Sequence, residues 1–145
     1  MHIEQLARRA CGALCLVVLV AACSAPEPKP SGPELDVTVK DFDVRPAVKE
    51  IPSGRITLDV WNEGPTTHEF VVVRSALPAR DLPIGEDGLS VDEDALDPLG
   101  EIEEVRDGAY EELTLDLAPG RYVLFCNLEG HYLSGMHASI EVADA

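Results

Sequence analysis

The sequence predicts an all-β fold, an antiparallel β-sandwich, and three observations support this prediction. Several short segments alternate apolar and polar residues, which is the pattern of a strand with one buried face. Glycine and proline separate these segments at the places where the chain must turn. Little of the chain has the apolar spacing of a helix. Short strands of this kind are typical of two packed antiparallel sheets in a single domain.

The expected strands are of two kinds, alternating segments and short unbroken apolar runs rich in β-branched and aromatic residues. The segment Ile51-Pro-Ser-Gly is expected to be a turn between two of them. The aromatic side chains of Trp61, Phe70 and Phe125 are expected to fill the core. In chain order, the expected strands are 35–40, 56–61, 70–73, 113–117, 122–126 and 139–142.

Residues 75–108 depart from this pattern and are expected to form an acidic insertion. The segment is rich in Asp and Glu, contains three prolines, and has only Arg80 and Arg106 as basic residues. Residues 92–96 are compatible with one or two helical turns. Two interpretations are open: a solvated insertion that covers one edge of the sandwich, or a surface on which a partner docks.

The N-terminal residues predict export. Arg8 and Arg9 precede the apolar run 10–22, which is too short to span a bilayer but suits the core of a secretory signal. The sequence Val-Ala-Ala-Cys that ends at Cys23 resembles the lipobox of bacterial lipoproteins. That resemblance implies a signal peptide at 1–22 and a lipid on Cys23, followed by a flexible Pro-rich linker, 23–34.

The domain 35–145 would then be tethered to the outer face of the cell membrane, or to a membrane facing the periplasm in a Gram-negative host. An uncleaved short anchor, or an ordinary signal with a cysteine by chance, is the alternative. The whole chain carries a net charge of −16, and removal of 1–22, with two arginines and one glutamate, leaves −17. Such a charge disfavours nucleic acid and anionic lipid as ligands and favours a basic protein partner.

Cysteine usage singles out one thiol. Cys11 and Cys15 fall in the expected signal peptide and Cys23 is the expected lipid site, so Cys126 remains without a disulfide partner. A buried inert thiol is one interpretation. The neighbouring residues favour another, because His131 and Met136 follow within the same loop.

The loop that begins at Cys126 offers a thiolate, an imidazole and a thioether between two expected strands. Gly130 and Gly135 would let it fold back tightly, because glycine accepts backbone conformations that other residues avoid. A trigonal set of two histidines and one cysteine with a long axial methionine is associated with blue-copper electron transfer. The candidate for the second histidine is His68, at the start of the expected strand 70–73.

This pattern resembles the cupredoxins, whose upstream histidine follows an Asn-x-Gly type of turn and whose C-terminal loop reads Cys-x(n)-His-x(n)-Met. The resemblance covers roughly 35–142 and implies a Greek-key sandwich with one type 1 copper ion on His68, Cys126, His131 and Met136, the methionine being weak and axial. It also implies a carrier of single electrons through Cu(I) and Cu(II), and not an enzyme. With the expected lipid on Cys23, this carrier would be tethered to a membrane.

The sequence departs from this family next to two of the expected ligands. Many members have Asn after the upstream histidine and Ser or Thr after the cysteine, and these residues tie the two ligand segments together. Here the positions hold Glu69 and Asn127. We expect the side-chain amide or the backbone of Asn127 to meet the Glu69 carboxylate. His137 is expected to point away from Met136, as a surface or packed histidine.

In this interpretation His131 presents an imidazole edge to solvent, ringed by Leu128, Tyr132 and Leu133, where a redox partner docks. The main alternative is a copper-binding module that stores copper or delivers it to another exported protein. A nucleophilic enzyme using Cys126 and His131 is a further alternative. It is disfavoured because no oxyanion motif is recognisable and the chain is short.

Overall fold

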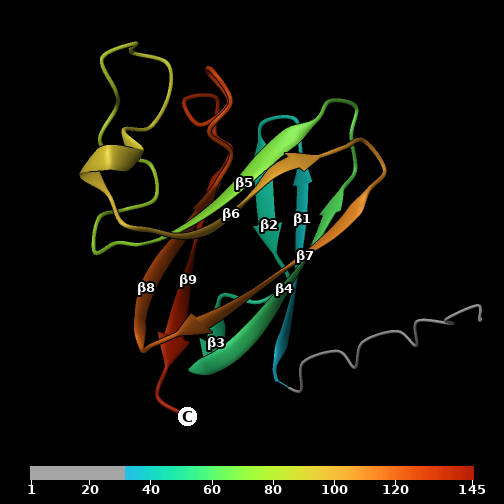
Figure 1. Cartoon of the computed structure of the whole chain (residues 1–145), viewed down its shortest axis with the longest axis vertical. Helices are drawn as coiled ribbons and strands as arrows, with labels where there is room; N and C mark the ends of the chain where they lie inside the picture. The colour runs from blue at the N-terminus through green and yellow to red at the C-terminus, as the bar shows by residue number, and fades with distance from the viewer. Residues whose placement is uncertain (1–31) are drawn as a thin grey trace, which may run out of the picture.

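The computed structural model describes residues 32–145 as two β-sheets packed face to face (Figure 1). The expected signal peptide 1–22, the lipidation site Cys23 and most of the expected linker lie outside the described residues. Within 32–145, no helix has the length and apolar character needed to cross a membrane. The first sheet has the order β2 (Asp43–Pro46), β1 (Glu34–Lys40), β4 (Gly54–Asn62) and β7 (Tyr110–Leu117). The second has the order β3 (Glu50–Pro52), β9 (His137–Ala143), β8 (Gly120–Phe125), β5 (His68–Arg74) and β6 (Pro98–Val105).

The all-β sandwich is confirmed, but its sheets are mixed rather than purely antiparallel. Strand β1 pairs in parallel with β4, and β3 pairs in parallel with β9. Alternation of apolar and polar residues reports which face of a strand is buried and says nothing about the direction of its neighbour. The segment expected as a turn, Ile51-Pro-Ser-Gly, begins inside the short strand β3, and the chain turns only after Pro52.

The core lies between the sheets and is formed by the alternating residues of the expected strands. Ile56, Leu58 and Val60 on β4 are each 0% exposed. Full burial of an aliphatic side chain of this size contributes about 1.5–3 kcal/mol. Phe70 belongs to this cluster, as expected. Trp61 does not belong to the core, because it alternates along β4 with residues that face inward. It lies half-buried on the outer face of the sheet, with its ring 4.6 Å from that of Tyr110.

Strands β5 and β8 are buried on both faces, which explains their unbroken apolar runs. One face of each strand packs against the first sheet. The other face forms a second cluster with residues of the segment 75–97 and of the loop between β8 and β9. The members of this second cluster are Val71, Val73, Leu82, Val91, Val123, Phe125 and Tyr132, with Ala79 and Leu96 packed against it.

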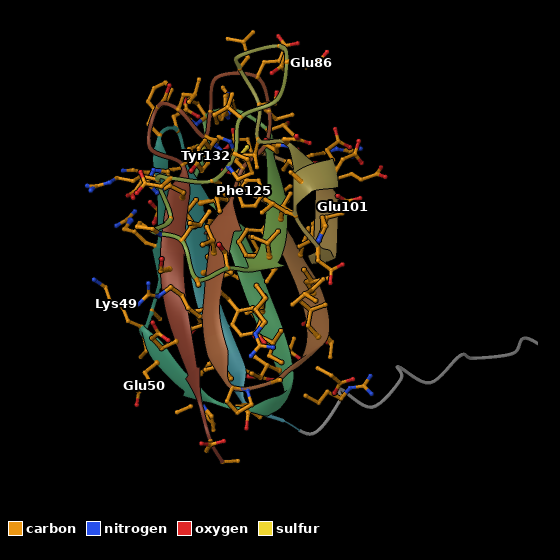
Figure 2. All side chains as sticks on the ribbon, turned by 90° about the vertical axis from the view of Figure 1, so that its left-hand side faces the viewer. Lys49, Glu50, Glu86, Glu101, Phe125 and Tyr132 are labelled. Atoms are coloured by element: carbon orange, nitrogen blue, oxygen red, sulfur yellow. The ribbon has the colours of Figure 1, made fainter. Side chains whose placement is uncertain are left out.

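The expected insertion 75–108 therefore divides into two parts. Residues 98–105 form β6, an edge strand that pairs with β5. Residues 75–97, called the insert below, cover the outer face of the second sheet rather than its edge. The insert contains a 3-10 turn at Glu93–Ala95, capped by the Asp92 side chain, within the segment expected to be helical. Figures 1 and 2 show the insert beside the β8–β9 loop, at one end of the sandwich, with Glu86 at its tip.

Hydrogen bonds fasten the insert to the β8–β9 loop, residues 126–136. The Tyr132 hydroxyl donates to the Ala79 carbonyl at 2.7 Å and accepts from the Leu82 N–H at 2.9 Å. The Asn127 side chain accepts from the Val91 N–H at 2.7 Å and donates to the Val91 carbonyl at 3.2 Å. It also donates to the Glu93 carboxylate at 2.6 Å. The insert and the loop are thus held as one unit.

Replacement of Asn127 by alanine is expected to loosen this unit, because it leaves both backbone groups of Val91 without their partners. We expect a loss of about 1–3 kcal/mol in the free energy of unfolding, measured by denaturant titration, and faster hydrogen exchange of the Val91 amide, measured by NMR. Ser134→Ala is the matched control, because this exposed side chain of the same loop bonds only the Gly130 carbonyl. Unchanged exchange at Val91 would contradict the prediction.

Candidate metal centre

The β8–β9 loop leaves one strand at Cys126 and enters the next after Met136. The Cys126 N–H donates to the Met136 carbonyl at 3.1 Å, and the Met136 N–H donates to the His131 carbonyl at 3.1 Å. Gly130 and Gly135 have positive φ angles, 77° and 110°, which is the conformation that glycine adopts most readily. The loop therefore closes on itself and brings the backbones of its three candidate ligands together.

His68 reaches the same place from the start of β5. The segment before it is organised by Asn62, the buried last residue of β4. The Asn62 side chain donates to the carbonyls of Thr66 and Val105, both at 2.8 Å, and accepts from the Gly64 N–H at 2.7 Å. Every polar atom of this buried amide thus has a partner, and the segment that delivers His68 is fixed at both ends.

Three donor side chains converge at the end of the sandwich. The Nδ1 atoms of His68 and His131 are 3.3 Å apart, and the Cys126 Sγ lies 3.5 Å from Nδ1 of His131. One candidate ligand atom from each of these residues lies within 4.8 Å of the others. His68 and Cys126 are 0% exposed, whereas His131 is half-buried. Met136 is also 0% exposed and belongs to the same core cluster as Cys126.

The Cys126 sulfur lies in a buried environment that holds two backbone donors. Burial raises the pKa of the Cys126 thiol, and hydrogen bonds from the N–H groups of Leu128 and Glu69 act in the opposite direction. The backbone nitrogen of Glu69 lies 3.4 Å from the Cys126 Sγ. Burial is also the main reason that the pKa of His68 is lowered; the neighbouring His131 adds to this, and Asp41 opposes it. Neutral imidazole and a sulfur that receives N–H donors are suited to bind a metal ion.

The side chain of Asn127 is bonded to the insert and not to Glu69. The backbone N–H of Asn127 acts to lower the pKa of the Glu69 carboxyl. The pKa of Glu69 is nevertheless raised to about 7, first by burial and then by the nearby carboxylates of Glu93, Glu101 and Glu103. Carboxylate oxygens of Glu69, Glu93 and Glu101 lie within 4.8 Å of one another.

Two aromatic residues near His131 differ from the expectation. Tyr132, expected at an exposed rim, is 2% exposed because its ring packs under the insert. Phe42, which the sequence did not single out, is 59% exposed with its ring 6.4 Å from that of His131. Leu128 and Leu133 are exposed, as expected. The ring of His137 lies 5.1 Å from that of Tyr132 in a tilted arrangement, and His137 is not part of the three-residue donor group.

Asp41 is another residue near the donor group that the sequence did not single out. Its carboxylate lies 3.3 Å from Nε2 of His68, the ring nitrogen other than the Nδ1 that faces the donor group. Nothing in the local sequence marks this residue, which stands in the turn after β1.

The donor set fits copper. Thiolate and thioether sulfur suit Cu(I), and imidazole nitrogen suits both oxidation states of the metal. Zinc is less well matched to a set that includes methionine. The ligand atoms of the three side chains are close enough to one another to bind one shared ion.

Comparison with known proteins places this geometry in a family. The sequence model of the cupredoxin-like domain family matches residues 13–137. No curated protein sequence matches the chain. Similar solved structures include auracyanin from Roseiflexus castenholzii, with a TM-score of 0.58 and 22% identity over 77% of this chain and 98% of that one. Rusticyanin from Thiobacillus ferrooxidans has a TM-score of 0.54 and 18% identity, covering 77% of this chain and 79% of its own.

Auracyanin A from Chloroflexus aurantiacus, described as a blue copper protein, has a TM-score of 0.50 and 19% identity over 74% of this chain and 98% of that one. At these identities the solved structures establish a shared fold. The family match spans most of the sequence, and His68, Cys126, His131 and Met136 lie within the matched range. The chain therefore belongs to the cupredoxin-like domain family.

Proposed function

We propose that this protein is a type 1 blue-copper electron carrier. The observation that carries the proposal is the buried group formed by Nδ1 of His68, Sγ of Cys126 and Nδ1 of His131. These three side chains would hold one copper ion, with Met136 as a weak axial ligand. Bound copper supplies a one-electron couple between Cu(I) and Cu(II), and the protein acts as a carrier without a substrate of its own.

The surrounding structure suits rapid electron transfer because the donor groups are held before a metal binds. Asn62 fixes the segment before His68, and the insert fixes the loop that contains Cys126 and His131. Side chains that cannot relax between the two oxidation states keep the reorganisation energy low. His131 is the only half-buried member of the three-residue group and would give the electron its route to the surface.

Replacement of Cys126 by serine tests this proposal. Purified protein loaded with Cu(II) is expected to show the intense visible absorption of a copper–thiolate bond and a reversible couple in voltammetry. Cys126→Ser removes the thiolate and should abolish the visible band, while His137→Gln, a change next to the site, should retain it. A wild-type protein that binds only Cu(I), and releases it readily to a chelator, would instead favour a module for copper storage or delivery.

The redox partner is proposed to be a basic protein that docks over His131. Phe42, Leu128 and Leu133 are 59%, 37% and 53% exposed and offer a small apolar contact of the kind used in brief encounters. The net charge of −16 would attract a basic partner over a longer range.

Oxidation of a small basic cytochrome by the Cu(II) protein, followed by stopped-flow absorbance, tests this docking. We expect the bimolecular rate constant to fall about tenfold or more from low to high salt. Leu133→Asp should slow the reaction at every salt concentration, because it places a charge in the apolar contact. Leu99→Asp, which makes the same change near the far end of the sheet, is the control. A bimolecular rate constant that changes neither with salt concentration nor with the Leu133→Asp substitution would exclude this mode of docking.

The protein is further proposed to be held at a membrane by a lipid on Cys23. The support comes from the sequence around Cys23 and from the Pro-rich segment that follows it. In a bacterial host that processes lipoproteins, the wild-type chain should fractionate with membranes and incorporate labelled fatty acid. Cys23→Ser should lose the label and leave the membrane fraction. Equal labelling of both chains would refute the assignment.

A further inference from the structure

The Nε2 nitrogen of His68 needs a hydrogen-bond acceptor. His68 is 0% exposed, and its Nε2 atom is buried without a well-aligned hydrogen bond within the part of the chain that the structure describes. With Nδ1 directed at Cys126 and His131, the proton of the neutral ring belongs on Nε2. A buried N–H without a partner is destabilising, so an acceptor at this position would matter for the stability of the site.

The Asp41 carboxylate lies where that acceptor is needed. Its Oδ1 is 3.3 Å from Nε2 of His68, a distance suited to a hydrogen bond although the alignment in the structure is imperfect. The same oxygen accepts from the Thr66 hydroxyl at 2.7 Å. Thr66 stands two residues before His68 in the segment that Asn62 holds, and Asp41 directly follows β1. The carboxylate is therefore fixed relative to the ring by residues from two separate strand ends.

We propose that Asp41 is a positioning residue for the metal centre, accepting the Nε2–H of His68 so that Nδ1 is the nitrogen offered to copper. This inference rests on the copper site proposed above. Histidines that bind metal ions commonly donate their other ring N–H to a carboxylate, which fixes both the tautomer and the orientation of the ring. The Asp41 side chain is 29% exposed, so water screens its charge only in part.

Two consequences follow, one for geometry and one for charge. The hydrogen bond holds the imidazole plane toward Cys126 and His131 before copper arrives. The negative charge behind the ring interacts more favourably with Cu(II) than with Cu(I), because the attraction grows with the charge of the ion. Asp41 would therefore lower the reduction potential of the centre relative to a neutral residue at the same place.

Three variants of the full chain separate these effects. Asp41→Asn keeps the shape and an acceptor oxygen but removes the charge, and Asp41→Ala removes both. Asp43→Asn makes the same change of charge two residues away, where the side chain is 42% exposed and pairs with Arg45 at 2.8 Å. Circular dichroism of each variant establishes that it has folded before the other measurements are made.

In the copper-free protein at a pH where the ring is neutral, 15N NMR reports which nitrogen of His68 carries the proton. We expect the Nε2–H tautomer in wild type, Asp41→Asn and Asp43→Asn, and a mixture of tautomers in Asp41→Ala. In the copper protein, both changes of Asp41 should raise the reduction potential, so that the ratio of Cu(I) to Cu(II) at the wild-type midpoint rises roughly tenfold. Affinity for Cu(II) should fall roughly 10–100-fold in Asp41→Ala.

Identical tautomers in wild type and Asp41→Ala, or a potential that responds equally to Asp41→Asn and Asp43→Asn, would overturn the role of Asp41. These results are distinct from failure of the proposed function. If wild-type protein formed no blue Cu(II) complex, the copper assignment would fall, and the NMR comparison in the copper-free protein would still decide whether Asp41 sets the tautomer of His68.

Discussion

The register of three neighbouring strands is the constraint on which the metal centre depends. Strands β5 and β8 pair antiparallel with Val71 opposite Phe125, so the start of β5 lies beside the end of β8. Strands β8 and β9 pair with Phe125 opposite His137, and one further step along this ladder sets Cys126 opposite Met136. Two backbone registers thus bring His68, Cys126 and Met136 to one end of the sheet, and only His131 needs a loop to reach them. A shift of one residue in either ladder would turn the side chains to opposite faces.

Much of this arrangement could be predicted from residue types and their order, because a soft donor set and alternating strands leave clear patterns in a sequence. Strands β2, β3 and β6 were not expected from the sequence, because they lack such patterns. Strand β6 is mostly exposed and so shows no regular apolar face. Strand β2 has four residues of which only Val44 is buried, and β3 is three residues long and contains Pro52. The sequence did not predict that Asp41 and Phe42 would lie at the site, and the reason is different. They meet the site only because parallel pairing of β1 with β4 brings the turn after β1 next to the segment that precedes His68.

The insert links the fold to the site in a way that its composition alone does not reveal. Its acidic residues suggested a solvated cover, yet its apolar residues Leu82 and Val91 seal the outer face of β5 and β8. The Asn127 side chain and the Tyr132 hydroxyl are committed to this contact. Because the Asn127 side chain bonds to Val91 and Glu93 of the insert, this residue connects the insert to the loop that contains Cys126.

The charges around the donor group would act on a bound copper ion in opposing directions. Backbone N–H groups that point at the Cys126 sulfur draw electron density from it and favour the reduced ion. The carboxylate of Asp41 beside His68, and that of Glu69 when ionised, would favour the oxidised ion. The two carboxylates differ in their surroundings: Glu69 faces other acidic groups that raise its pKa, whereas Asp41 receives a hydrogen bond from Thr66 and faces an imidazole. The two carboxyl groups therefore reach the centre by different routes: Asp41 contacts the buried ring of His68, whereas Glu69 adjoins the Cys126 sulfur through its own backbone N–H.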